Sequence, residues 1–371
     1  MSNKKIGILT FHRAENYGAI LQSYSLFSTL NLIKNLDVFL IDYRSNELEK
    51  PYRLIYFGND NKIIYNFLKS IALLWKNIIK KKNFNSFRRN NMLLTKSIYD
   101  KKSFYNLLNE FDYVITGSDQ VWNLDITKDD KDIYLLNDLK RDNQYKKISY
   151  AASIGSDLKN EEYYKIISNA INDYKSVSVR EELAKKYLEE YTNKNIKVCI
   201  DPVLLQKEAF WKKVSRKSNI TKKYLFVYTI DLDDKMINYA NKLAKDKELL
   251  IVHVDKKGRY KEKSKSMYQC GPDIFLDLIC NAEYVLTNSF HGLAFSIIFK
   301  KQFVVFPKKG RNSRIENLLN LCGLEQRNYN SNINIDDKID YVVVNKKMDK
   351  YIDESIKFLE ESIDMEKNNE K

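Results

Sequence analysis

A short strand that runs through a small polar turn straight into a helix is the pattern that most constrains this chain, and residues 284–299 (YVLTNSFHGLAFSIIF) show it best. Residues 284–286 form the end of a buried strand, and the apolar run 293–299 has helical length. The turn between them therefore lies at the amino end of a helix, where unpaired N–H groups and the helix dipole favour an anion. His291, one of three histidines in the chain, lies in this turn. It is either a helix cap or a reacting group.

The same order of elements opens the chain. Residues 5–11 are a compact apolar strand, and residues 19–33 repeat apolar side chains at helical spacing. The polar segment between them carries His12, Asn16 and Tyr17. It lacks the G-x-G-x-x-G pattern, which argues against a standard dinucleotide site.

A third turn of this kind follows the strand 112–116 and contains Asp119, Gln120 and Trp122. An aromatic ring beside amide and carboxylate groups is one way in which proteins hold sugars, because the ring stacks on the sugar while the polar groups bind its hydroxyls. A tight turn with a buried tryptophan is the alternative interpretation.

Two arginine positions suit an anionic ligand. Arg180 comes directly after the strand 176–179, where it is well placed for a bidentate contact with a carboxylate or a phosphate. In the second half of the chain, Arg311 and Arg314 lie in a basic loop before a helix. That loop is either an anion receptor or simply solvated.

The alternation of strands and helices predicts an α/β fold with two Rossmann-like domains that face a cleft. A chain of 371 residues exceeds what one hydrophobic core usually supports. We place the first domain at residues 1–205 and the second at 206–348. The helix expected at 349–363 is predicted to pack back on the first domain.

Composition narrows the environment. The four cysteines stand far apart without a Cys-x-x-Cys pair, as expected for thiols in a reducing compartment. No signal peptide or membrane-spanning run is evident, so we expect a cytoplasmic protein. The net charge of +14 calls for an anionic partner, unless it only reflects genome composition. The basic amphipathic segment 62–89 either packs on its own domain or lies on the inner membrane surface.

Five segments, in this order, resemble the polysaccharide pyruvyl transferases: GILTFHRAENYGAILQSY, YVITGSDQVWN, SVRE, IDPVLL and TNSFHGLAFSIIF with the following RIENLL. The resemblance spans residues 5–327. It implies a GT-B-like fold and the transfer of pyruvate from phosphoenolpyruvate (PEP) to a sugar of a cell-surface polymer, usually as a cyclic ketal. It also implies functional roles at the positions of Arg180 and His291. Family members often carry Arg-Leu-His where this chain has Ser289-Phe290-His291, so Arg311 or Arg314 is a candidate for holding the donor carboxylate.

These observations give a set of site predictions. His291 is the expected catalytic residue, and the PEP site is expected to contain Arg180, Asn288, Ser289, Arg311 and Arg314. The acceptor, a sugar or lipid-linked glycan, is expected against His12, Asn16, Tyr17, Asp119, Gln120 and Trp122. No metal and no cofactor beyond the donor PEP is expected. A nucleotide-sugar glycosyltransferase, with Glu316 as its ribose-binding carboxylate, is the nearest alternative. A nucleic-acid-binding module is less favoured because the lysines are scattered and no recognition motif is present.

Overall fold

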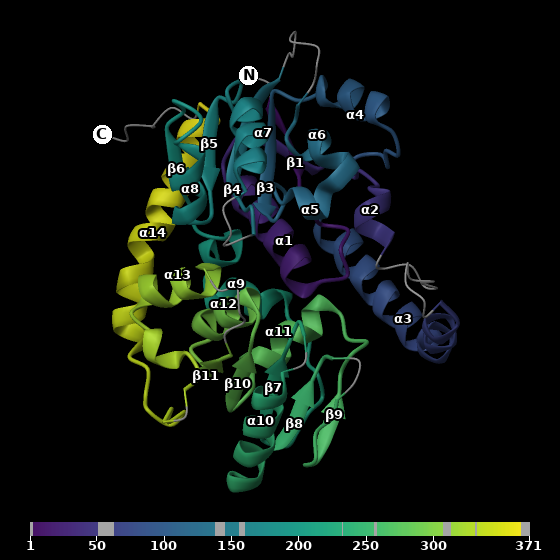
Figure 1. Ribbon diagram of the computed structural model, residues 1–371, viewed down its shortest axis with the longest axis vertical. Helices are drawn as coiled ribbons and strands as arrows, with labels where there is room; N and C mark the ends of the chain where they lie inside the picture. Colours follow the sequence, from purple (N-terminus) through teal and green to yellow (C-terminus); the bar gives the residue numbers. More distant parts are fainter. Residues whose placement is uncertain are drawn as a thin grey trace. The chain divides into compact units, whose positions relative to one another are not determined.

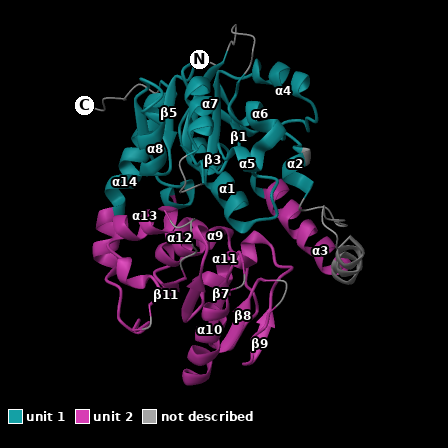
Figure 2. Cartoon of the chain, viewed as in Figure 1, with its two compact units in different colours: residues 1–52, 91–205, 348–371 teal, residues 53–90, 206–347 magenta. Residues whose placement is uncertain are grey.

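Each half of the chain is built on its own parallel sheet, as the ribbon of the computed structural model shows (Figure 1). The structure describes residues 3–50, 63–137, 145–155, 160–231, 233–255, 258–306, 313–330 and 332–364. The chain divides into two compact units (Figure 2): residues 1–52, 91–205 and 348–371 form unit 1, and residues 53–90 and 206–347 form unit 2. The predicted α/β class with two Rossmann-like sheets is confirmed.

Unit 1 alternates strands with helices. Its strands are β1 (Lys4–Leu9), β2 (Leu36–Leu40), β3 (Tyr113–Asp119), β4 (Lys146–Ala152), β5 (Ser176–Val179) and β6 (Ile196–Val198). Its helices are α1 (Tyr17–Asn31), α2 (Asn46–Glu49), α4 (Lys101–Leu108), α5 (Leu124–Thr127), α6 (Lys131–Tyr134), α7 (Glu161–Ile171) and α8 (Glu182–Leu188), with 3-10 turns at Lys128–Asp130 and Pro202–Leu205.

The sheet of unit 1 has the order β2-β1-β3-β4-β5-β6, and all its pairs are parallel. Its central strands are buried on both faces because helices cover both sides, as is usual for parallel sheets. Strand order reverses between β1 and β3. In sheets of this type, ligands bind beyond the carboxyl ends of the strands at such a switch point.

Unit 2 has the strands β7 (Tyr224–Tyr228), β8 (Leu250–His253), β9 (Ser264–Ser266), β10 (Tyr284–Thr287) and β11 (Gln302–Val305). Its helices are α9 (Glu208–Val214), α10 (Asp234–Asp246), α11 (Pro272–Cys280), α12 (Phe290–Ile298) and α13 (Ser313–Cys322), with a 3-10 turn at Glu325–Arg327. Helix α3 (Ile63–Asn91) belongs to this unit up to residue 90.

The second sheet has the order β11-β10-β7-β8-β9 and is also parallel, so its switch point lies between β7 and β10. Aromatic rings fill the core beneath it. Phe275 contacts Phe226 and Phe295 edge to face, with ring centroids 5.9 and 6.3 Å apart. Such pairs add to the free energy gained from burial, and they fix α11 and α12 against the sheet.

The last helix, α14 (Tyr341–Ser362), begins eight residues before the expected position 349. Asp340 explains the earlier start, because its carboxylate accepts hydrogen bonds from the amides of Val342 and Val343. Within unit 1, the end of this helix is held by a hydrogen bond from the Ile200 amide to Ser355 and by contact between the rings of Tyr150 and Phe358.

Candidate functional site

A pocket of about 360 Å³ lies at the switch point of the first sheet, and all of its walls belong to unit 1. The residues that follow β1, β2 and β3 supply most of the lining. They are Thr10, Phe11, Arg13, Ala14, Asn16, Ala19, Tyr43, Ser45, Glu47, Leu48, Glu49, Asp119, Gln120, Asp125, Ile126, Lys128 and Tyr134. Its volume lies within the range usual for small-molecule sites, roughly 300–1,000 Å³.

The cations that line this pocket are already paired with carboxylates. Arg13 Nε lies 2.8 Å from Glu49 Oε1, and Lys128 Nζ lies 3.5 Å from Glu47 Oε2. Asp119 and Asp125 also line the pocket, and neither forms an ion pair within the described part of the chain. The lining therefore carries an excess of negative charge.

Three of the predicted acceptor residues, Asn16, Asp119 and Gln120, line the pocket. Asn16 also caps α1, because its side chain accepts hydrogen bonds from the amides of Gly18 and Ala19. Asp119 adopts a φ of 74° and its carboxylate accepts the Gln120 amide proton at 2.9 Å. The sequence did not predict this conformation, because the strand expected to end at residue 116 continues as β3 through Asp119.

The other three predicted acceptor residues do not line the pocket. Trp122 is fully buried and its ring packs edge to face on Tyr174, so the stacking interpretation is wrong and the buried-turn alternative holds. Tyr17 is buried in the first turn of α1. His12 is 1% exposed, with its ring nitrogens 3.2 Å from the Thr10 carbonyl oxygen and 3.4 Å from Asp42 Oδ1. Both side chains are therefore buried in the interior of unit 1.

Asp42 contacts two arginines, and one of them, Arg13, lines the pocket. Its carboxylate lies 2.9 Å from Arg44 Nη2 and 3.5 Å from Arg13 Nη1, and it accepts a hydrogen bond from Ser97. Burial acts to raise the pKa of this carboxyl. Hydrogen bonds from His12 and Ser97 and the charges of His12 and Arg13 outweigh burial, so the pKa lies well below its usual range. Asp42 therefore stays ionised and holds Arg13 at the pocket wall.

Arg180 follows β5, as the sequence predicts, but it is only 4% exposed. Its Nη1 lies 2.5 Å from Asp201 Oδ2 and its Nε lies 3.5 Å from Glu181 Oε1. Burial acts to lower the pKa of the guanidinium, but the nearby charges of Asp201, Glu181 and Asp119 raise it. In unit 1 this cation is neutralised by carboxylates of its own chain.

In unit 2, the residues predicted around His291 lie at the switch point between β7 and β10. Asn288 joins the two strand ends, because its side chain accepts the Ile230 amide proton and donates to the Asp231 carbonyl oxygen. The Ser289 side chain makes no capping hydrogen bond to α12. His291 is the second residue of that helix and is 7% exposed, with its ring edge to face on Phe290.

The first turn of α12 lies very close to the strand that precedes it. A Cβ added at Gly292 would lie 2.1 Å from Thr287 Oγ1, and that hydroxyl accepts the Ser289 amide proton and donates to the Tyr228 carbonyl oxygen. Only glycine permits this approach. Thr287 and Gly292 thus fix the position of His291, although the sequence singled out neither of them for this role.

Arg311 and Arg314 are the remaining predicted donor residues. Arg311 lies outside the described residues. Arg314 is half-buried in the first turn of α13. This helix follows β11, the strand that pairs with β10 in the unit 2 sheet.

Comparison with known proteins decides the family. The family model described as polysaccharide pyruvyl transferase matches residues 16–308, well over half of the chain. The chain belongs to this family. The family model therefore confirms the resemblance found in the sequence and makes the protein a transferase of polysaccharide biosynthesis. The matched interval includes Arg180, Asn288, Ser289 and His291, whereas His12 and Arg314 fall outside it.

Solved structures are similar to this chain at low sequence identity. An S. aureus MnaA–UDP structure has 12% identity and a TM-score of 0.49, covering 99% of this chain and 92% of that one. UDP-GlcNAc 2-epimerase from Neisseria meningitidis has 9% identity and a TM-score of 0.48, with 98% and 94% covered. The glycosyltransferase SnogD from Streptomyces nogalater has 9% identity and a TM-score of 0.36, with 97% and 99% covered. No curated protein sequence is significantly similar to the chain.

One histidine of this pyruvyl transferase was not predicted as a site residue from the sequence. His253 ends β8, is 3% exposed, and has its Nδ1 3.1 Å from Asp255 Oδ2. Tyr260 covers the ring at a centroid distance of 4.9 Å and donates a hydrogen bond to Asp255. The signal was a histidine at a strand end with a carboxylate two residues later. All three histidines thus lie at or just beyond the carboxyl ends of strands.

The described ranges contain neither a candidate metal site nor a candidate membrane-spanning helix. No group of three or more His, Cys, Asp or Glu side chains there could hold a metal ion. No helix in the same ranges combines the length and the apolar character needed to cross a bilayer.

Proposed function

We propose that this protein transfers pyruvate from PEP to a pair of sugar hydroxyls in a cell-surface polysaccharide or its lipid-linked precursor, forming a ketal. The family match over residues 16–308 carries the proposal. The setting of His291, in the first turn of a helix at a sheet switch point, supports it.

The reaction requires one proton donor and a set of fixed positive groups. Protonation of the PEP methylene carbon gives an oxocarbenium-like centre, which one sugar hydroxyl attacks. Phosphate then leaves, and a second hydroxyl closes the ketal ring. Imidazole is suited to such proton transfer because its ordinary titration range is near neutrality. We assign the proton transfer to His291.

The donor is proposed to bind at the carboxyl edge of the unit 2 sheet. The Ser289 side chain does not cap the first turn of α12, and the helix dipole and the backbone N–H groups of that turn favour an anion. Ser289 and Asn288 frame this turn, and Arg314 with Arg311 would add positive charge from the α13 side. Arg180 stays in the donor set on the family resemblance. Its pairing with Asp201 and Glu181 makes it the member that most needs a separate test.

The acceptor is proposed to bind in the unit 1 pocket. PEP carries a phosphate and a carboxylate, and the excess of carboxylates in this lining disfavours such an anion. Sugar hydroxyls, in contrast, donate hydrogen bonds that carboxylates accept well. Asn16, Asp119 and Gln120 are the proposed contacts.

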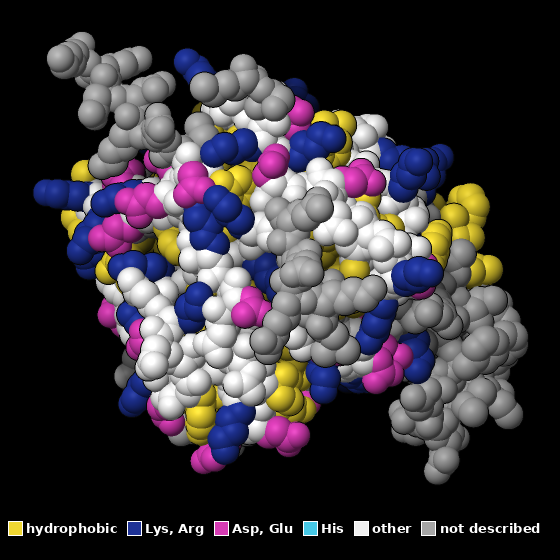
Figure 3. All heavy atoms as spheres, turned by 90° about the horizontal axis from the view of Figure 1, so that it is seen from above, with side chains coloured by type: hydrophobic (Ala, Val, Ile, Leu, Met, Phe, Trp, Pro, Cys, Tyr) yellow, Lys and Arg dark blue, Asp and Glu magenta, His cyan; other side chains and the backbone are white. Residues whose placement is uncertain are grey.

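We place the reaction in the cytoplasm, on the side of the membrane where polysaccharide precursors are assembled. The four cysteines are free thiols and three of them are buried, which suits a reducing compartment. A nucleic-acid partner is not proposed, because Lys and Arg are interspersed with Asp and Glu over the face shown in Figure 3.

Two assays run side by side test the proposal. The purified protein is incubated with PEP and candidate envelope glycans, and phosphate release is measured together with the product mass. We expect phosphate release that depends on the glycan and a mass gain that corresponds to one pyruvyl ketal. Nucleotide release from a nucleotide sugar, without phosphate release from PEP, would instead identify a glycosyltransferase and refute the proposal.

A further inference from the structure

Helix α3 carries an exposed stripe that changes from apolar to basic along its length. Trp75 is 72% exposed and Ile78 is 39% exposed. Lys82 and Arg89 are exposed further along the helix. Positions separated by three, seven and fourteen residues lie on one helix face, so these four side chains share a surface.

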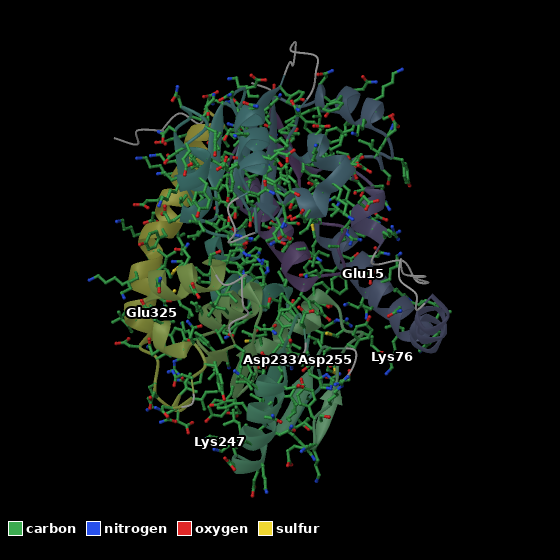
Figure 4. The ribbon with its side chains drawn as sticks, viewed as in Figure 1. Glu15, Lys76, Asp233, Lys247, Asp255 and Glu325 are labelled. Carbon is green, nitrogen blue, oxygen red and sulfur yellow. The ribbon has the colours of Figure 1, made fainter. Side chains whose placement is uncertain are left out.

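This part of α3 is strongly and uniformly positive. Residues 74–91 contain four lysines and two arginines, without any aspartate or glutamate. Lys76, Lys82 and Arg89 form no ion pair with a carboxylate in the part of the chain that the structure describes. Figure 4 labels Lys76 on this helix. No negative charge in this part of α3 therefore opposes the binding of an anionic partner.

The opposite face of the helix holds it in unit 2. Phe84 and Phe87 are buried, Asn83 donates a hydrogen bond to the Gln269 carbonyl oxygen, and Tyr268 donates one to Asn77. The Lys80 ammonium lies 4.9 Å from the Tyr268 ring centroid. Packing is thus satisfied by residues other than Trp75, Ile78, Lys82 and Arg89, which leaves the exposed stripe available for a partner.

We propose that this stripe binds the surface of an anionic lipid bilayer. Trp75 and Ile78 would enter the headgroup region, where tryptophan is enriched in membrane proteins, and Lys82 and Arg89 would contact lipid phosphates. A helix with one apolar-to-basic face and no acidic residue matches such a surface in charge and in amphipathic character. The inference extends the proposed function, because it would bring the enzyme to a lipid-linked acceptor, but binding itself needs neither PEP nor glycan.

Vesicle co-sedimentation of the full chain tests the inference. We compare phosphatidylcholine vesicles with vesicles that also contain phosphatidylglycerol, at low and at high salt. Binding should require the anionic lipid and weaken with salt. The double variant K82Q/R89Q should lose roughly 25-fold in affinity, since each cation near an anionic leaflet contributes roughly a fivefold factor. W75A/I78A should lose about tenfold, from the lost burial of apolar surface.

The chain offers matched controls for both variants. K338Q/K346Q removes the same charge from other exposed positions, and L32A with V342A removes apolar side chains that are 76% and 80% exposed. These controls should bind vesicles like the unmodified protein, and thermal melting checks the folding of every variant.

Several results would overturn the inference. They are equal binding to both kinds of vesicle, unchanged binding of both α3 variants, displacement by an oligonucleotide at stoichiometric amounts, or a dimer in light scattering that W75A/I78A dissociates. Vesicle binding by a protein that releases no phosphate from PEP would leave this inference standing and refute only the proposed function.

Discussion

The carboxyl edges of the two sheets began as the same sequence pattern and became different chemical environments. In unit 1, the switch point is crowded with carboxylates, and Arg13 and Arg180 are each bound to carboxylates of the same unit. In unit 2, the switch point presents an amide, a hydroxyl and an imidazole around the first turn of α12. Strand–turn–helix order places side chains at an edge, but the charges on neighbouring strands decide what that edge can bind.

The histidines make the contrast concrete. His12 and His291 both follow a strand of a parallel sheet, and both are buried. His12 lies against the Asp42 carboxylate, in a network that also includes Arg13 and Arg44. His291 lies beside Phe290 at a helix start. The first environment suits a structural role, and the second suits the proton transfer proposed above.

The largest expected effect separates these two residues. His291→Gln should lower kcat for pyruvyl transfer by roughly 10²- to 10⁴-fold, the usual contribution of a general acid or base, while PEP affinity stays within a few-fold. His12→Gln should lower thermal stability and leave kcat within a few-fold. The measurements are steady-state kinetics, PEP titration calorimetry and thermal melting of both variants. A His291→Gln enzyme that turns over at the original rate would remove the proposed catalytic role.

The second prediction compares two arginines. Arg180→Met would leave the Asp201 and Glu181 carboxylates buried without their cation, so we expect a loss of about 3–5 kcal/mol in the free energy of unfolding. Arg314→Gln removes a half-buried side chain and should lower that free energy by less than Arg180→Met does, while weakening PEP binding about tenfold. Urea unfolding and PEP titration measure the two effects.

Asp201→Asn, combined with Arg180→Met, provides the control for the first arginine. Removing one of the unpaired carboxylates should recover part of the stability that Arg180→Met loses. If Arg180→Met instead folds normally and loses only PEP affinity, then Arg180 is a donor ligand and its pairing with Asp201 is broken when PEP binds.

Sequence patterns predicted most of the fold because both signals that they use are local. Apolar strands and helical spacing identified both sheets, and turn residues placed Asn16, Asp119 and His291 at strand ends. The burial of Trp122 and the pairing of Arg180 with Asp201 depend on residues 52 and 21 positions away, respectively. Spacing cannot show such contacts. The contact of Gly292 with Thr287 was missed for a different reason, since it depends on the angle between helix and strand.

The third prediction uses pH to compare the carboxylates of the two units. The pKa of Asp42 is depressed in the folded protein, so its contribution to stability is present above its unfolded pKa and is lost as pH falls below it. We therefore expect stability to fall below roughly pH 4–5. Asp42→Asn should cost about 2 kcal/mol at pH 7 and flatten this acid limb.

Asp336→Asn in unit 2 is the matched control for Asp42. Hydrogen bonds from Lys247 and Tyr284 lower the pKa of Asp336 as well, but this carboxylate is exposed to solvent. Exposed ion pairs contribute little to stability. The stability of Asp336→Asn should thus fall at acid pH in the same way as that of the unmodified protein, as measured by chemical denaturation at a series of pH values. Equal flattening in both variants would show that the Asp42 network contributes no more than a surface pair.

The smallest expected effect tests the assignment of the acceptor to unit 1. Asp119→Asn keeps the shape of a side chain that lines the pocket but removes its negative charge. We expect the KM for the acceptor to rise about three- to tenfold, roughly the contribution of one hydrogen bond, since a neutral amide accepts less strongly than a carboxylate. The PEP affinity should change less than the acceptor KM, because the proposed donor residues of α12 and α13 belong to the other unit and only Arg180 belongs to unit 1. A selective loss of PEP affinity in Asp119→Asn would reverse the assignment of donor and acceptor to the two sheet edges.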